Sequence, residues 1–185
     1  MSEAGIQIGV ARLRAGAIVA ERGAAAVDEA AVRVALSEVM DPELPMLSVV
    51  DLGIVHRVDV APDDGPIRVW ILPTFVGCPA LELIKTSIAE RLAAFGRPVE
   101  VAATFEVPWT SERITAAGRA ALSAAGIAPP SGESGPVLID LEPRVPCPHC
   151  GSRRTVVENL FGPTQCRTIR YCADCRQPFE SIKTV

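Results

Sequence analysis

Four of the six cysteines occur as two close pairs near the end of the 185-residue chain. Two residues separate Cys147 from Cys150 and Cys172 from Cys175, and 21 residues lie between the pairs. A C-x-x-C turn points two thiolates at one centre, so two such turns supply four sulfur ligands at tetrahedral geometry. The spacing therefore predicts a structural Zn²⁺ site. Thiolate sets also accept iron–sulfur clusters, and a redox or disulfide role for some of these thiols is the other alternative.

A fifth cysteine lies in the run Gly77-Cys78-Pro79, directly before an amphipathic segment. Proline suits the first position of a helix, which would make Cys78 its N-cap. The unpaired N–H groups and the positive end of the helix dipole meet at that point and stabilise a thiolate. We therefore expect a lowered pKa for Cys78, with enhanced reactivity or metal affinity. The alternative is a small buried cysteine that packs a tight turn.

The sixth cysteine, Cys166, lies six residues before Cys172. It is a packed thiol, a spare ligand that lets the tail hold an iron–sulfur cluster, or a thiol that relays a cluster from Cys78. Three acidic residues, Asp41, Glu43 and Asp51, lie in predicted loops that could approach Cys78. Loop carboxylates are most often solvated caps or turn formers, so each is a weak signal by itself.

The elements that must position these residues follow from periodicity and from turn residues. Hydrophobic spacing and Gly/Pro punctuation predict six elements in the order α-β-β-α-β-α. Their expected limits are a helix from the Asp28 cap to Met40, strands 54–60 and 67–72, a helix from Pro79 to Phe95, a strand 99–107, and a helix from the Ser111 cap to Gly126. This pattern predicts an α+β domain with a mixed three-stranded sheet, followed by a small β-rich zinc ribbon.

The predicted domain organisation has four parts. Residues 1–26 are an Ala- and Gly-rich extension expected to be flexible, and residues 27–126 are the α+β domain. Residues 127–145 contain the run IAPPSGESGP and are expected to form a linker. Residues 146–185 are the four-cysteine ribbon, in which a metal ion replaces the core that about 40 residues cannot supply.

Composition excludes several classes of protein. The chain is 49% hydrophobic and 22% charged, which is typical of a globular protein. Residues 146–185 carry a net charge of +3, but four thiolates with Zn²⁺ contribute about −2. This leaves no basic footprint for nucleic acid. Apolar runs such as Ala15–Ala20 are too short to span a membrane or to form a signal peptide. Reduced cysteine pairs favour a cytoplasmic protein.

Two stretches of the chain resemble known families. The runs MDPELPMLSVVDLGIV (Met40–Val55) and PTFVGCPALELI (Pro73–Ile84) resemble the iron–sulfur-assembly domain of SufT-type proteins. The tail VPCPHCGSRRTVVENLFGPTQCRTIRYCADCRQPFESIKTV is similar to that of the PaaD family of phenylacetate degradation, which joins the two domains in this order. The match includes WTSERITAAGR and IAPP, and it covers about residues 28–185.

The resemblance implies a non-catalytic accessory subunit of the phenylacetyl-CoA epoxidase system, which helps to mature or repair an iron–sulfur or iron centre. Its partners would be the epoxidase and reductase proteins, with no nucleic acid and no membrane, and a homodimer stays open. By the same resemblance, Cys78 holds or passes iron or a transient cluster, and Glu43, Asp51 and Thr74 match recurring polar positions. The alternatives are a general iron–sulfur carrier, a nucleic-acid-binding zinc ribbon and a thiol oxidoreductase.

Overall fold

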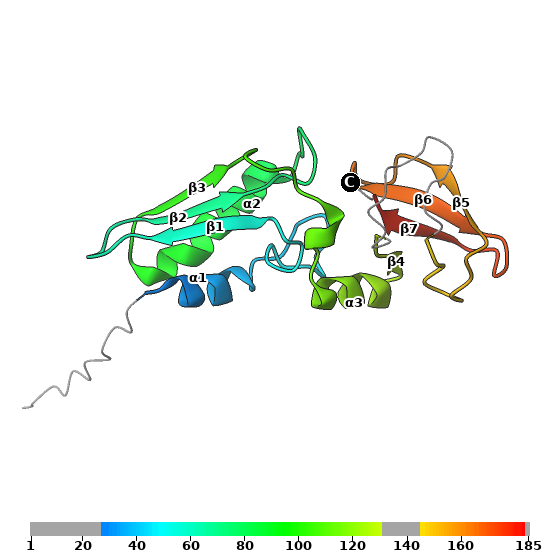
Figure 1. Ribbon diagram of the computed structural model, residues 1–185, viewed down its shortest axis with the longest axis horizontal. Helices are drawn as coiled ribbons and strands as arrows, with labels where there is room; N and C mark the ends of the chain where they lie inside the picture. Colours follow the sequence, from blue (N-terminus) through cyan, green and yellow to red (C-terminus); the bar gives the residue numbers. More distant parts are fainter. Residues whose placement is uncertain (1–26, 131–144, 184–185) are drawn as a thin grey trace, which may run out of the picture.

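The first domain is a three-stranded sheet with two helices along one side of it (Figure 1). The structure is a computed structural model, and it describes residues 27–130 and 145–183. The elements are α1 (Glu29–Leu36), β1 (Val55–Val60), β2 (Ile67–Ile71), α2 (Leu81–Leu92) and β3 (Val99–Ala103). Strand β2 pairs antiparallel with β1 and parallel with β3. The predicted α+β class and its mixed sheet are therefore confirmed.

Both helices form where apolar side chains recur at helical spacing. The Asp28 carboxylate accepts the Ala31 N–H at 2.8 Å and caps α1, as the sequence predicts. Helix α2 buries one stripe of three side chains, each of which contributes about 1.5–3 kcal/mol: Ile84, Ile88 and Leu92. A single 3-10 turn, η1 (Ala93–Phe95), then ends the helix at Gly96, whose φ is 69°.

Two predicted elements are shorter in the structure. Helix α1 ends at Leu36 and not at Met40, because Met40 pairs with Ser48 in a β-bridge and the Val39 carbonyl accepts the Val49 N–H at 2.8 Å. Extended pairing thus replaces the last helical turn. Strand β3 ends at Ala103 and not at residue 107, because its partner β2 stops at residue 71 and offers no further backbone groups.

The third helix begins later than predicted. Ser111 opens a 3-10 turn, η2 (Ser111–Arg113), and the helix that follows is α3 (Ala116–Ala124). The cap of α3 is Thr115, whose Oγ1 accepts the Gly118 N–H at 3.0 Å. The predicted Ser111 cap is therefore wrong, because Thr115 offers a hydroxyl at the N-terminus of the longer amphipathic segment.

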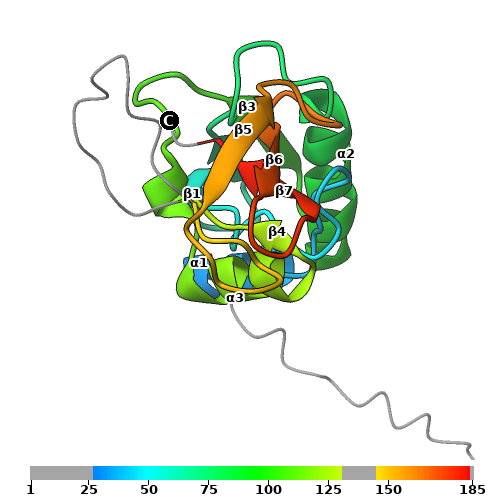
Figure 2. The same cartoon turned by 90° about the vertical axis from the view of Figure 1, so that its right-hand side faces the viewer.

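The ribbon is a four-stranded sheet that lies at the end of the first domain nearest α3 (Figures 1 and 2). Its strands are β4 (Ile127–Ala128), β5 (Thr155–Asn159), β6 (Arg167–Cys172) and β7 (Pro178–Ile182), in the order β4-β7-β6-β5. Strand β4 falls at the start of the predicted linker and pairs parallel with β7. The rest of that linker from 131 to 144, and the predicted extension 1–26, lie outside the described residues.

The two domains share a hydrophobic core. Ile127 and Ile182, from the ribbon sheet, belong to the same buried cluster as Leu44, Leu52 and Ile84 of the first domain. A second, smaller cluster holds the ribbon together: Ala128, Val145, Cys147, Cys172 and Phe179. Because the ribbon has so little core of its own, it depends on the first domain on one side and on its four cysteines on the other.

Candidate metal centre and interdomain pocket

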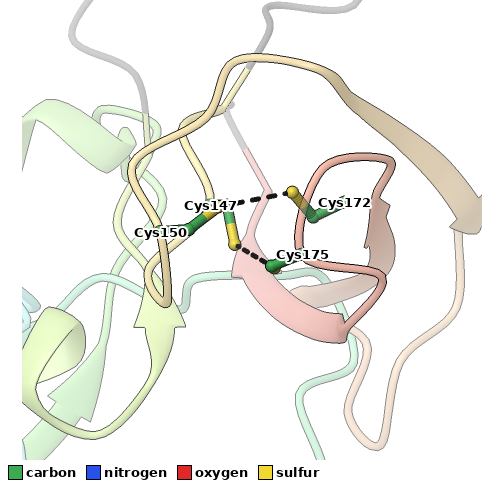
Figure 3. A group of neighbouring side chains, drawn as sticks. All are labelled: Cys147, Cys150, Cys172 and Cys175. Carbon is green, nitrogen blue, oxygen red and sulfur yellow. Dashed lines mark hydrogen bonds between the residues drawn. The ribbon is translucent and has the colours of Figure 1, made fainter.

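The four paired cysteines converge on one point (Figure 3). Their sulfur atoms all lie within 4.8 Å of one another. The contacts Cys147 Sγ to Cys175 Sγ and Cys150 Sγ to Cys172 Sγ are both 3.6 Å. A tetrahedral ZnS₄ centre with bonds of about 2.3 Å has edges of about 3.8 Å, whereas a disulfide bond is about 2.05 Å long. The spacing of the sulfurs therefore fits one tetrahedral metal ion and fits no disulfide.

Each pair is held by the same backbone turn. Gly151 and Arg176 each follow the first cysteine of their pair by four residues, and each has a left-handed φ, of 73° and 58° respectively. Their N–H groups donate to the Cys147 and Cys172 carbonyls at 2.8 and 2.9 Å. Two equivalent turns thus bring the pairs face to face, so the site is built by the backbone before any metal binds.

Hydrogen bonds to sulfur prepare the site for a cation. The Cys175 and Asp174 N–H groups lower the pKa of Cys172 to about 6, since each stabilises the thiolate. Around the cysteines, Arg154 Nη1 donates to Asp174 Oδ1 at 2.6 Å. The Thr155 hydroxyl donates to the Val145 carbonyl at 2.7 Å and closes the far side. The arrangement can hold a thiophilic divalent metal with no open position.

A second candidate site is a small pocket between the two domains, which we call the interdomain pocket. Its volume is about 20 Å³, close to what one water molecule needs. Its polar lining consists of Asp41, Glu43, Thr74, Cys78 and Cys166. The apolar lining comes from Leu44, Leu52, Ile54, Leu72, Pro73, Leu81, Ile84 and Ile182. The structure thus gathers four of the five predicted transfer residues, Glu43, Thr74, Cys78 and Cys166, at one place.

Asp51 is the predicted residue that lies elsewhere. Its Oδ2 accepts the Ser48 hydroxyl at 2.7 Å, and its Oδ1 accepts the Thr115 hydroxyl at 2.8 Å. Its carbonyl also accepts the Thr115 N–H at 2.9 Å. These bonds fasten the loop before β1 to the start of α3, and they occupy the carboxylate. Asp51 does not line the interdomain pocket.

Asp41 takes its place, although the sequence analysis gave it only the weak signal of a loop carboxylate. Its side chain is buried, and its Oδ1 accepts the Glu43 and Leu44 N–H groups, both at 2.8 Å. Burial raises its pKa, and the nearby Arg167 guanidinium partly offsets that rise. The short spacing Asp41-Pro42-Glu43 could have indicated the pair, because an Asx turn folds the two carboxylates onto one side of a loop.

Cys78 differs from its prediction in two respects. Helix α2 begins at Leu81, so Cys78 sits in the preceding loop and not at the cap. Its pKa is raised and not lowered: burial disfavours the thiolate, and the charges of Glu43 and Asp41 add to that effect. The Ala80 N–H at the sulfur works the other way but is outweighed. At neutral pH the thiol is therefore protonated until a cation displaces its proton.

Cys166 lies at the opposite end of β6 from the four-cysteine site. The strand β6 separates it from Cys172, a distance of about 20 Å at roughly 3.3 Å per residue. It is therefore not a fifth ligand of the ribbon site, whose group is Cys147, Cys150, Cys172 and Cys175. Its sulfur contacts the Thr164 hydroxyl at 3.1 Å, and burial raises its pKa.

An α+β domain with a cysteine-lined pocket, joined to a four-cysteine ribbon, defines a two-domain protein built to bind metal. Comparison with protein families supports this class. Residues 29–105 match the family described as iron–sulfur cluster assembly protein, and residues 132–183 match the PaaD zinc beta ribbon domain. Within residues 27–130 and 145–183, no helix is long and apolar enough to cross a membrane.

Comparison with individual proteins narrows the class. A protein of Escherichia coli (strain K12), named as a subunit of 1,2-phenylacetyl-CoA epoxidase, is 36% identical over 154 residues, which cover 81% of this chain and 89% of that protein. The chain therefore belongs to the PaaD family, together with this epoxidase subunit.

Other relatives share the first domain. An "Iron-sulfur cluster carrier protein" of Mycobacterium tuberculosis (strain H37Rv) is 39% identical over 82 residues, which are 44% of this chain and 18% of that protein. A crystal structure of a DUF59 domain from Bacillus anthracis is 27% identical, with a TM-score of 0.47, over 51% of this chain and 90% of that one.

Proposed function

We propose that this protein is a non-catalytic accessory subunit of the phenylacetyl-CoA epoxidase system in aerobic phenylacetate catabolism. In this role it matures or repairs an iron–sulfur or iron centre of the oxygenase or of its reductase. One observation carries the proposal: a chain that matches the Escherichia coli epoxidase subunit across both domains places Cys78, Glu43 and Thr74 in one pocket of its iron–sulfur-assembly domain. The 39% identity to a cluster carrier supports iron or a cluster as the cargo.

The size of the interdomain pocket supports an accessory role. Pockets that bind organic ligands measure about 300–1,000 Å³, whereas this pocket has a volume of about 20 Å³. An acyl-CoA substrate therefore cannot reach Cys78, but a metal ion can be held there after a small movement of the loop. Thiols and carboxylates are also the donors that iron and its clusters use.

In the ribbon, we propose a structural Zn²⁺ ion bound by Cys147, Cys150, Cys172 and Cys175. The four sulfurs form a closed set with tetrahedral spacing, which suits a metal that stays in place. Free thiols of this kind persist in a reducing compartment, which supports a cytoplasmic protein whose partners are the epoxidase and reductase polypeptides. With an overall charge of −4, the chain is a poor ligand for nucleic acid.

The test is a strain that lacks this protein. We expect the oxygenase and reductase polypeptides to be present at normal levels, with a reduced iron content in the client and slow epoxidation of phenylacetyl-CoA. Wild-type protein should restore both quantities and Cys78→Ser should restore neither. The matched control is Val76→Ala, a change of an exposed side chain in the same loop, which should behave as wild type. Normal epoxidation in the deletion strain would contradict the proposal.

The alternative of a general iron–sulfur carrier is favoured by the shared carrier domain. The same strain separates the two. A dedicated helper affects only the epoxidase system, whereas loss of a general carrier also lowers the activity of unrelated iron–sulfur enzymes, such as aconitase, during growth on a carbon source that does not need the epoxidase.

A further inference from the structure

Two cysteines that are 88 positions apart in the sequence line the same pocket. Cys78 comes from the loop before α2 in the first domain, and Cys166 comes from the residue before β6 in the ribbon. The thiols lie close enough for the charge of Cys166 to influence the ionisation of Cys78. The carboxylates of Glu43 and Asp41 act on both thiols in the same way.

The surroundings of Cys166 are those of a ligand and not of a packing residue. Packed cysteines sit among apolar side chains, as Cys147 and Cys172 do in the ribbon core. Cys166 belongs to neither hydrophobic cluster among the described residues. Its sulfur instead contacts the Thr164 hydroxyl at 3.1 Å and faces the carboxylate side of the pocket.

The residue after Cys166 fixes the ribbon against the first domain. Arg167 Nη1 donates to Glu180 Oε2 at 2.6 Å, and Nη2 donates across the domain boundary to the Glu43 carbonyl at 3.3 Å. Its Nε donates to the Thr164 hydroxyl at 3.0 Å. Together with the burial of Ile182 in the first-domain core, these bonds hold Cys166 over the pocket.

We propose that the cargo-binding site is composite: Cys78, Cys166 and Glu43 bind one Fe²⁺ ion together, so that the ribbon supplies a ligand and is more than a recognition module. The identity of the ion rests on the proposed function, whereas the pairing of the two thiols rests on the structure alone. Two thiolates and one carboxylate form a mixed sulfur–oxygen set that suits ferrous iron. Binding releases the two thiol protons to solvent, with no change of oxidation state.

Among the carboxylates of the pocket, Glu43 is the better candidate ligand. The Asp41 Oδ1 already accepts two backbone N–H groups and shapes the loop, whereas no hydrogen bond to the Glu43 carboxylate is found among the described residues. The ribbon cysteines are also the only described group of three or more such residues whose ligand atoms lie within 4.8 Å of one another. The interdomain pocket is therefore open where the ribbon site is closed, as a site that loads and releases cargo requires.

The experiment uses Co²⁺ as an anaerobic optical probe for Fe²⁺, added to the two-domain protein whose ribbon is already loaded with zinc. Wild-type protein should bind one additional Co²⁺ and show a near-ultraviolet thiolate-to-cobalt absorption band. Cys78→Ser and Cys166→Ser should each lower that band at saturation by about half, and the double variant should lose it. Glu43→Gln should weaken the affinity by roughly tenfold or more and keep the band. Val76→Ser serves as the matched control, and one zinc per chain shows that each variant is folded.

Two outcomes overturn the composite site. The first is a wild-type protein that binds no additional Co²⁺, and the second is a Cys166→Ser variant whose band and affinity equal those of wild type.

Failure of the composite site is distinguishable from failure of the proposed function in the deletion strain. If Cys166→Ser restores epoxidation and Cys78→Ser does not, maturation stands and the composite site falls. If both variants restore epoxidation while the cobalt result holds, the site stands and the maturation role falls.

Discussion

Removal of the metal from the four-cysteine site should unfold the ribbon and loosen the interdomain pocket. The ribbon core contains two sizeable side chains that are not ligands, Val145 and Phe179, whose burial contributes about 3–6 kcal/mol together. A structural Zn²⁺ supplies an apparent 10–16 kcal/mol in zinc-finger peptides, so the metal contribution is the larger by about a factor of two to three. Without it we expect β5, β6 and β7 to lose their structure.

The loss should reach the first domain through Ile182. This side chain is 3% exposed and packs in the first-domain core, where its burial contributes about 1.5–3 kcal/mol. Its release should lower the melting temperature of the first domain by roughly 6–24 °C, at about 4–8 °C for each kcal/mol. Strand β4 also loses its partner β7, so the end of α3 should become less stable.

Hydrogen exchange read by mass spectrometry measures this directly, before and after treatment with a strong chelator. We expect peptides covering β5–β7 to exchange rapidly in the metal-free protein, while peptides covering α2 stay protected, and added Zn²⁺ should restore protection. Cys166→Ser is the matched control, since it should retain the metal and the protection. Continued protection of β5–β7 after complete metal loss would refute the reasoning, because it would mean that packing alone holds the ribbon.

Three further changes test individual contacts. Burial raises the pKa of Asp41 above the 3.8 of an unfolded chain, so its contribution to stability is present below about pH 3.8 and lost as pH rises through the folded-state pKa. Asp41→Asn should therefore raise the melting temperature at pH 7 and leave it unchanged at pH 3. Thr115→Ala removes the cap of α3 and a partner of Asp51, and should lower the free energy of unfolding in urea by about 1–2 kcal/mol with unchanged metal content. Arg167→Met removes a charged hydrogen bond to Glu180 at a side chain that is 12% exposed, and should cost about 1.5–3 kcal/mol in the same urea experiment. A loss below about 0.5 kcal/mol for Arg167→Met would show that Arg167 is not a clamp.

Local features were predictable from the sequence because the chain itself sets the distances. The C-x-x-C turns depend on residues at most five positions apart, and the structure places all four sulfurs together. The hairpin of β1 and β2 and the buried stripe of α2 follow from periods of 2 and 3.6 in the same way. The four-cysteine group is thus found in the structure as the spacing predicts, whereas the identity of its metal stays a prediction.

Long-range features were not predictable, because they depend on how distant segments pack. The pKa of Cys78 is set by burial and by carboxylates about 35 positions away, which outweigh the local N–H group that the sequence suggested. Asp51 and Glu43 are similar loop acids in the sequence, yet one is occupied by Thr115 and the other lines the pocket. The position of Cys166 beside Cys78 results from β4–β7 pairing and from Ile182, neither of which has a local signal.

Transfer of iron to a client is the most direct test of the central claim. The two-domain protein is loaded anaerobically with ⁵⁷Fe, freed of unbound iron, and mixed with the metal-free reductase of the epoxidase system, whose ⁵⁷Fe content and electron-transfer activity are then measured. We predict that wild-type protein loads the reductase faster than an equal amount of free iron, and that Cys78→Ser does no better than free iron. Equal loading by wild type, Cys78→Ser and free iron would contradict the account.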